Sequence, residues 1–279
     1  MDLPSPLVSP EWLVEHLDSA GLAVADVRWV PGGSAADRFT VDHIAGAVSF
    51  DLDRHLASPP GEGPGRHPLP PPEAFAATMA AAGVGETDAV VAYDDAGGSI
   101  AARLWWMLAV TGHRAAVLDG GFAAWTGPVE TGPAGRREPA AFTARAWPKD
   151  FVTDADGVAR SLQDGSATVI DARAPERFRG ETEPIDPVAG HIPGSRSAPW
   201  AGNLDPTTGR FLAPEDLRGR FEELGAAGGP VIASCGSGTT ACHDVLALQL
   251  AGLGPTILYE GSWSDWSSDP SRPVAIGDE

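Results

Sequence analysis

The hydrophobic positions of this chain fall into short, almost uniformly apolar runs that alternate with longer segments of helical character. The runs "ATVIDA" (167–172) and "GPVIASC" (229–235) have the length and the β-branched content of buried strands. The segments "APEDLRGRFEELG" (213–225) and "TTACHDVLALQLAG" (239–252) have the start and stop signals of helices. Apolar strands that alternate with helices predict an α/β fold, a parallel sheet flanked by helices on both faces.

The first half of the chain shows the same alternation. Its predicted strand is "DAVVAYD" (88–94), and its predicted helices are "PPEAFAATMAAAG" (71–83) and "SIAARLWWMLAVTG" (99–112). We therefore expect two units of one plan.

Four sequence blocks of the first half recur in the same order in the second half. The pairs are "VADVR" (24–28) with "VIDAR" (169–173), "HIAGAVSF" (43–50) with "HIPGSRSAPW" (191–200), "VVAYDDAGGSIAARLWWML" (90–108) with "VIASCGSGTTACHDVLAL" (231–248), and "VLDGGFAAW" (117–125) with "LYEGSWSDW" (258–266). This recurrence predicts a duplicated domain. We place the first domain at 1–130, a linker rich in proline, glycine and charge at 131–150, and the second domain at 151–279.

Composition narrows the classes of function. The formal charge of −19 argues against a protein that coats nucleic acid or an anionic membrane, since both need a broad basic face. The two cysteines form neither a disulfide framework nor the close pairs of a zinc site, so we expect no metal. The N-terminus has no signal-peptide pattern and no apolar run could span a bilayer, which favours a cytoplasmic location.

The stretch "SCGSGTTAC" (234–242) lies where a predicted strand ends and a predicted helix begins, the edge at which sites form in parallel sheets. Gly236 and Gly238 allow positive φ, so that successive amides can point into one anion-binding nest, to which the helix dipole adds positive potential. The hydroxyl donors at its rim are Ser237, Thr239 and Thr240. Such a loop favours the thiolate of Cys235, which makes this cysteine a candidate nucleophile.

A glycine-rich turn can also hold a small buried residue without any chemistry. The repeat bears on this alternative, because the aligned blocks place Asp94 of the first copy where the second has Cys235. One copy thus keeps the fold without the thiol, so packing does not require it. Cys242 lies about two helical turns further on. We interpret it as a buried structural thiol, with a resolving cysteine as the alternative.

These features together resemble the two-domain rhodanese family of sulfurtransferases. The resemblance rests on the tandem copies, on "DAR…ERFRG…GHIPGS", and on "CGSGTTAC" followed by "YEGSWSDW". It implies two tandem rhodanese-like domains, of which the N-terminal one is catalytically silent. It further implies that Cys235 takes sulfur from a small anionic donor as a persulfide and passes it to cyanide, a thiol or thioredoxin, without a cofactor. We expect a monomer or weak dimer.

The same resemblance assigns roles to individual residues. The implied catalytic residues are Cys235, Ser237, His43 and Asp37, the last two from the N-terminal domain. The implied substrate-binding residues are Arg177, Arg179, Gly236, Gly238, Thr239 and Thr240. Arg177 matches an arginine that binds the donor carboxylate. The animal enzymes carry a second one in the stretch that here reads "GETEPIDPVAG" (180–190), without arginine, so Arg179 is the candidate replacement. Arg28, Arg173 and His191 fit structural roles.

The residues after the cysteine bear on the donor. Family members that prefer thiosulfate usually carry basic residues there, as in CRKG, whereas Gly236 and Ser237 resemble the 3-mercaptopyruvate group. The sequence therefore predicts a 3-mercaptopyruvate sulfurtransferase, with a thiosulfate sulfurtransferase as the alternative. A phosphatase of this fold would need arginine at the position of Ala241. A binding module without catalysis is the remaining alternative, and the retained Cys235 argues against it.

Overall fold

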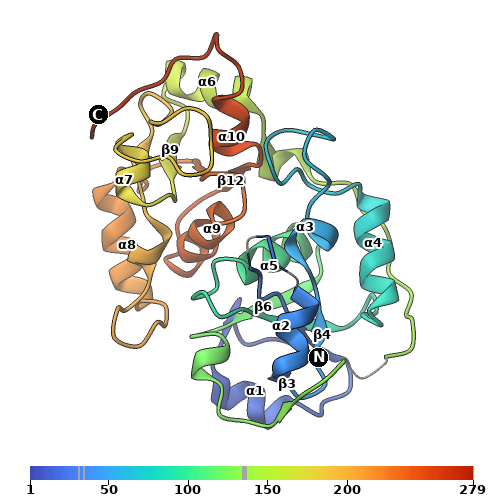
Figure 1. Ribbon diagram of the computed structural model, residues 1–279. Coiled ribbons are helices and arrows are strands. Elements are labelled where there is room, and N and C mark those ends of the chain that lie inside the picture. Colours follow the sequence, from blue (N-terminus) through green and yellow to red (C-terminus); the bar gives the residue numbers. More distant parts are fainter. Residues whose placement is uncertain (31, 34, 134–136, 279) are drawn as a thin grey trace. The chain divides into compact units, whose positions relative to one another are not determined.

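The protein is described by a computed structural model that covers residues 1–30, 32–33, 35–133 and 137–278. Its contacts divide the chain into two compact units, each built around one five-stranded parallel sheet (Figure 1). Unit 1 comprises Met1–Ser58, Pro70–Trp147 and Thr208–Arg210, and unit 2 comprises Pro59–Leu69, Pro148–Thr207 and Phe211–Glu279. The segment Pro59–Leu69, which we call the arm, is thus grouped with unit 2, although the chain on both sides of it belongs to unit 1.

Unit 1 has the strand order β1-β6-β5-β2-β4. These strands are β1 (Leu7–Val8), β2 (Leu22–Asp26), β4 (Val48–Ser49), β5 (Ala89–Tyr93) and β6 (Arg114–Leu118). Its helices are α1 (Pro10–His16), α2 (Ala35–Val41), α3 (Leu52–His55), α4 (Pro72–Ala81) and α5 (Ala101–Val110), and a 3-10 turn covers Phe122–Ala124. A separate antiparallel pair joins β3 (His43–Ile44) to β7 (Val129–Glu130).

Unit 2 has the equivalent strand order, β10-β9-β11-β12-β8. These strands are β8 (Val152–Thr153), β9 (Thr168–Asp171), β10 (Arg196–Ser197), β11 (Val231–Ser234) and β12 (Thr256–Tyr259). Its helices are α6 (Ala155–Asp164), α7 (Pro175–Phe178), α8 (Pro214–Glu223), α9 (Ala241–Leu250) and α10 (Ser262–Trp266), with 3-10 turns at Lys149–Phe151 and Trp200–Asn203. The helix α9 packs on β11 and β12, while α6 packs on β8 and β9.

The two orders match strand for strand, which confirms the predicted α/β fold with a duplicated plan. In both sheets the longest strands are the central ones, and β2 and β5 of unit 1 are buried along their whole length. They carry the continuous apolar runs that indicated a sheet covered on both faces. The predicted helices at 71–83, 99–112, 213–225 and 239–252 are present as α4, α5, α8 and α9, each trimmed by one or two residues at its ends.

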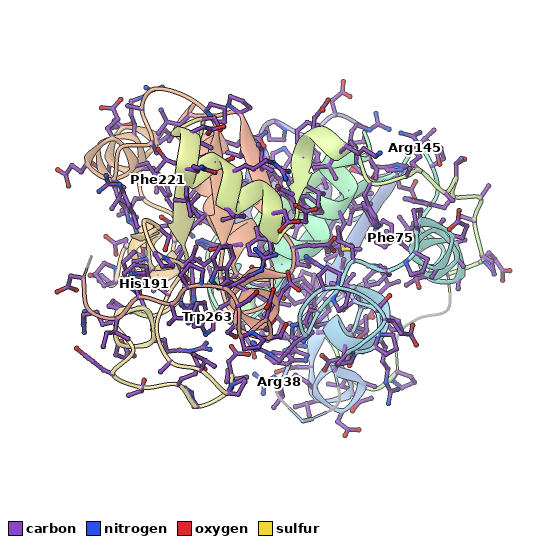
Figure 2. All side chains as sticks on the ribbon, turned by 90° about the horizontal axis from the view of Figure 1, so that it is seen from above. Arg38, Phe75, Arg145, His191, Phe221 and Trp263 are labelled. Carbon is purple, nitrogen blue, oxygen red and sulfur yellow. The ribbon has the colours of Figure 1, made fainter. Side chains whose placement is uncertain are left out.

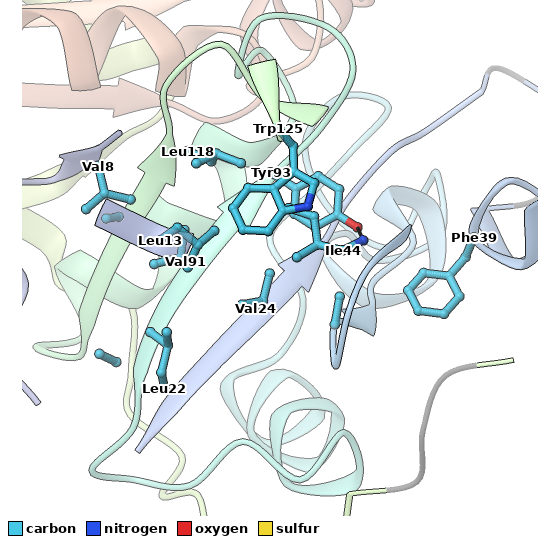
Figure 3. Close-up of a cluster of buried hydrophobic side chains, with 13 residues drawn as sticks. Val8, Leu13, Leu22, Val24, Phe39, Ile44, Val91, Tyr93, Leu118 and Trp125 are labelled. Atoms are coloured by element: carbon cyan, nitrogen blue, oxygen red, sulfur yellow. Dashed lines mark hydrogen bonds between the residues drawn. The ribbon is translucent and has the colours of Figure 1, made fainter. Parts of the chain in front are cut away.

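A core cluster of unit 1 runs along its sheet, from Leu22 at the start of β2 to Tyr93 and Leu118 at the ends of β5 and β6 (Figure 3). Val24, Val91 and Leu118 come from neighbouring strands and pack with Trp125. The buried Tyr93 hydroxyl donates to Asp26 (2.6 Å) and accepts from the Ile44 amide (3.1 Å). The two hydrogen bonds of this hydroxyl join β3 to the sheet. They also satisfy a buried polar group, which would destabilise the fold if it had no partner.

The recurring Asp-x-Arg motif forms the same buried ion pair in each unit. The Arg28 Nε group donates to both oxygens of Asp26 at 3.1 and 3.0 Å, and Arg173 repeats these distances with Asp171. Removing one partner of such a pair costs about 3–5 kcal/mol, because it leaves a buried charge unpaired. The geometry supports a structural role for both arginines.

The unit boundaries differ from the sequence boundaries at the linker as well as at the arm. Residues 137–147 pack on unit 1, where Trp147 donates to the Pro70 carbonyl (2.8 Å) and Arg137 to that of Gly83 (3.1 Å). The sequence predicted a linker here, and its aromatic and arginine side chains bind it to unit 1.

Candidate functional site

Cys235 follows β11 directly and begins the loop that leads into α9. Its side chain is buried, and the Ser237 amide donates to its Sγ at 3.4 Å. Gly238 has φ +75°, and a Cβ atom there would lie 2.3 Å from the Glu260 carbonyl. Gly236 does not have positive φ, contrary to expectation, so it is Gly238 that turns the chain around the sulfur.

The first turn of α10 supports the cysteine from the other side. Ser262 accepts a hydrogen bond from the Cys235 amide (3.0 Å), its Oγ lies 4.0 Å from Sγ, and it donates to the Tyr259 carbonyl (2.8 Å). Ser262 is the one described residue other than glycine with positive φ (52°). Left-handed backbone costs roughly 1–3 kcal/mol for such a residue, so a hydroxyl is held beside the sulfur despite strain.

The variants Ser262→Gly and Ser262→Ala separate this hydroxyl from the strain. The equivalent residue of unit 1 is Gly121, with φ +57°, so the fold accepts glycine here. Both variants lose the hydroxyl that pairs with the Cys235 amide, so turnover should fall about tenfold in both. Only Ser262→Gly relieves the strain, so it should be more stable than Ser262→Ala by about 0.5–1 kcal/mol. Thermal unfolding and steady-state rates provide the check; full activity in Ser262→Gly would contradict it.

The equivalent loop of unit 1 shows what this nest holds. Asp94 occupies the position of Cys235, and its carboxylate accepts four backbone amides. The donors are the amides of Ala96 (2.9 Å), Gly98 (2.8 Å), Ile100 (2.8 Å) and Ala101 (2.9 Å). Burial raises the pKa of Asp94, and the four amides oppose that shift by favouring the carboxylate. Gly97 and Gly238 share positive φ, so both loops curl alike around their first residue.

Ser237 is in contact with a histidine of the arm. The His67 Nδ1 atom lies 2.7 Å from the Ser237 hydroxyl oxygen, within unit 2. The arm is held there by the Leu69 amide, which donates to the Glu260 carboxylate (2.9 Å). An imidazole can give or take a proton near neutral pH, and a serine hydroxyl can relay it. The pair is therefore suited to proton transfer next to the sulfur.

His43, which the sequence assigned to this role, makes its contacts with neighbouring residues of unit 1. It is fully buried, its ring stacks on Phe39 at 3.7 Å, and its Nδ1 lies 3.0 Å from the Phe39 carbonyl oxygen. His191, labelled in Figure 2, and Phe178 repeat this arrangement in unit 2, with a ring distance of 3.7 Å and a hydrogen bond of 2.8 Å. The repeat thus gives His43 the structural role that the sequence gave to His191.

Asp37, the other residue that the sequence assigned from the first domain, is exposed on α2 of unit 1. Its carbonyl accepts a hydrogen bond from the Thr40 hydroxyl (2.9 Å). The sequence predicted a histidine and an aspartate of the first domain as partners of Ser237. The structure shows a histidine partner that comes from the arm.

Arg177 lies close to the loop, as the resemblance implied. Its Nη2 donates to Glu183 (2.6 Å) and lies 3.4 Å from Asp186. A Cβ atom on Gly236 would lie 3.6 Å from its Nη1. Burial acts to raise the pKa of Glu183, but the hydrogen bond from Arg177, those from the Asp186 and Ile185 amides and the charge of Arg177 together hold the pKa below its ordinary value. The ion pair fixes the guanidinium over Gly236.

The remaining predicted residues are distributed as follows. Arg179 forms a half-exposed pair with Glu181 at 2.7 Å. The Thr239 hydroxyl is buried and has no hydrogen-bond partner among the described residues, whereas Thr240 caps α9 by position alone. Cys242 is fully buried, and its thiol donates to the Gly238 carbonyl (3.4 Å). The two cysteines form no disulfide with each other.

Two further searches concern the described residues only. No helix there is both long and apolar enough to cross a membrane. No cluster of three or more histidine, cysteine, aspartate or glutamate side chains in that part of the chain is arranged to hold a metal ion.

Comparisons with known proteins agree with this geometry. The model of the rhodanese-like domain matches residues 9–128 and 154–269. A probable 3-mercaptopyruvate sulfurtransferase of Pseudomonas aeruginosa is 44% identical and covers 98% of each chain. A putative thiosulfate sulfurtransferase of Mycobacterium tuberculosis is 38% identical over 92% of this chain and 91% of its own.

A solved structure extends the likeness to three dimensions. SseA from Escherichia coli, described as a 3-mercaptopyruvate enzyme with the rhodanese fold, has a TM-score of 0.82 and 33% identity, covering 93% of this chain and 99% of its own. The chain therefore belongs to the rhodanese family, as a sulfurtransferase with two tandem rhodanese-like domains.

Proposed function

We propose that the protein transfers a sulfur atom from 3-mercaptopyruvate to a thiol acceptor through a persulfide on Cys235. One observation carries the proposal: the loop that binds a carboxylate in unit 1 surrounds a cysteine in unit 2. A persulfide terminus is anionic, so amide donors that suit a carboxylate also stabilise a terminal sulfur. The buried Thr239 hydroxyl adds a donor without another partner in the described chain.

The reaction balances in two steps. The Cys235 thiolate attacks the donor sulfur, a sulfur–sulfur bond forms, and the carbon–sulfur bond breaks with its electron pair leaving on pyruvate enolate. The proton released by the donor thiol passes to the enolate, with His67 and Ser237 placed to relay it. An acceptor thiolate, free or on a thioredoxin-like protein, then takes the terminal sulfur and Cys235 leaves as thiolate.

The surroundings of Gly236 favour a carboxylate donor over thiosulfate. A side chain at this position would meet the guanidinium groups of Arg177 and Arg66, at 3.6 and 3.1 Å from its Cβ. A basic residue here, as in the CRKG loop, would place like charges together. Asp186 and Glu183 already balance these arginines, which suits a singly charged carboxylate better than a dianion.

Thiosulfate remains the second candidate because the Mycobacterium tuberculosis relative carries that name. Comparing kcat/KM for the two donors under identical conditions tests the choice. We expect mercaptopyruvate to be preferred, and a preference for thiosulfate would overturn the donor assignment while leaving sulfur transfer intact.

Ser237→Ala tests the proton relay. Breaking the carbon–sulfur bond needs a proton for the enolate, whereas sulfite leaves thiosulfate without one. We therefore expect kcat with mercaptopyruvate to fall about tenfold or more, and kcat with thiosulfate to change much less. Ser268→Ala, at an exposed serine of unit 2, is the control. Equal losses with both donors would rule out the proposed role of Ser237.

A further inference from the structure

The arm delivers a second arginine to the catalytic loop. Gly65, with φ +70°, passes so close to α10 that a Cβ atom on it would lie 2.4 Å from the Gly261 carbonyl. The next amide, that of Arg66, donates to the Ser264 hydroxyl (3.0 Å). The backbone at Arg66 is thus fixed in unit 2 independently of its side chain.

The guanidinium groups of Arg66 and Arg177 converge above Gly236. The position of a Cβ on Gly236 lies 3.1 Å from Arg66 Nη2 and 3.6 Å from Arg177 Nη1. Asp186 bridges the two groups, with one oxygen against Arg66 and the other 3.4 Å from Arg177. The Asp186 carboxylate of the protein itself therefore already contacts both arginines.

We propose that Arg66 is the second arginine of the donor site and that it holds the donor carboxylate together with Arg177. This inference rests on the proposed function, since it concerns the same reaction. Among the described residues, Arg66 Nη2 and Arg177 Nη1 make no hydrogen bond, and they lie 3.1 and 3.6 Å from the position that a Cβ on Gly236 would take. Two planar N–H donors on one carboxylate fix its orientation, so the sulfur of the donor is presented to Cys235.

The placement explains how this chain functions without an arginine at 180–190. Ile185 in that stretch is largely exposed, and Arg179 is paired with Glu181. Arg66 comes from a different part of the chain, but its guanidinium meets Asp186 of the same stretch. The binding site thus has two arginines, Arg177 and, from the arm, Arg66.

The repeat provides a matched control. Gly65-Arg66 before α4 recurs as Gly209-Arg210 before α8. Arg210 belongs to unit 1, where it pairs with Glu11 at 3.6 Å and lies near Gly120. Because the loop of unit 1 carries Asp94 in place of the cysteine, loss of Arg210 should not affect the donor.

The test uses the full chain with the variants Arg66→Ala, Arg66→Lys, Arg177→Ala and Arg210→Ala. The donors are mercaptopyruvate and mercaptoacetone, in which a methyl group replaces the carboxylate. Pyruvate, which keeps the carboxylate and lacks the sulfur, is titrated by NMR as an unreactive probe. A charged hydrogen bond contributes about 1.5–3 kcal/mol, so we expect Arg66→Ala to lower the mercaptopyruvate-to-mercaptoacetone ratio of kcat/KM at least about tenfold.

Arg66→Ala should weaken pyruvate binding by a similar factor, Arg66→Lys less, and Arg210→Ala not at all. If the loss merely reflected a displaced arm, both donors would slow equally through His67 and the ratio would stay constant, which would overturn the proposal. Unchanged pyruvate affinity in Arg66→Ala would overturn it as well. If the unmodified chain takes no sulfur from mercaptopyruvate but binds pyruvate through Arg66, the proposed function fails and this inference stands.

Discussion

Cys235→Ser is expected to abolish sulfur uptake and to lower turnover with either donor by about a thousandfold or more. The nest would still hold the side chain, but a serine hydroxyl remains protonated and cannot carry sulfane sulfur. The chain has a second thiol, Cys242 in α9, which donates to the Gly238 carbonyl at 3.4 Å. Because a carbonyl acceptor favours the protonated thiol over the thiolate, Cys242 should not substitute for Cys235.

Cys242→Ser is the matched control for this experiment. It removes the other cysteine of the chain at a cost in stability of roughly 1 kcal/mol, since a buried hydroxyl replaces a weakly polar thiol. Turnover per folded molecule should remain within about twofold. Sulfur uptake that follows Cys242 instead of Cys235 would contradict the assignment of the nucleophile.

His67→Asn is expected to produce the second-largest loss, about a hundredfold in kcat with mercaptopyruvate. The asparagine amide can still hydrogen-bond Ser237, so the arm should remain docked while the proton acceptor is lost. Steady-state kinetics with mercaptopyruvate provide the measurement, and an unchanged kcat would contradict the proton relay.

His43→Asn separates this role from packing. His43 is buried against Phe39, so its variant should lower the melting temperature yet keep turnover per folded molecule. The opposite pattern, with activity lost in His43→Asn and retained in His67→Asn, would restore the partner that the sequence predicted for Ser237.

The sheet of each unit could be predicted because burial leaves a direct pattern in the sequence. The strands β5 and β11 are short apolar runs, and the loops after them carry glycines whose freedom is needed. The glycines and the helix start after Cys235 predicted an anion nest, and in the aligned loop of unit 1 the Asp94 carboxylate does accept backbone amides.

His67 and Arg66 could not be found in the same way. They lie in a proline- and glycine-rich stretch without periodicity, and their effect depends on where the arm packs in three dimensions. The repeat did contain one usable signal, because His43 pairs with His191, which points to a structural role for both.

The two nests suggest how one loop serves two purposes. In unit 1 a carboxylate is fixed permanently by four amides, and the loop is locked. In unit 2 the Ser237 amide donates to the sulfur of Cys235 at 3.4 Å, so the first residue of the loop is a thiol of the chain itself. We infer that the loop holds a permanent structural anion where its first residue is Asp94, and a transferable sulfur anion where its first residue is Cys235.

The most direct test of persulfide transfer is the mass of the peptide that carries Cys235 after the full chain has reacted with mercaptopyruvate. The account predicts a gain of one sulfur atom on that peptide, none on the peptide's Cys242 after fragmentation, and loss of the added mass when an acceptor thiol is supplied. An unchanged mass at Cys235 while pyruvate is released would contradict the persulfide, and with it the central claim.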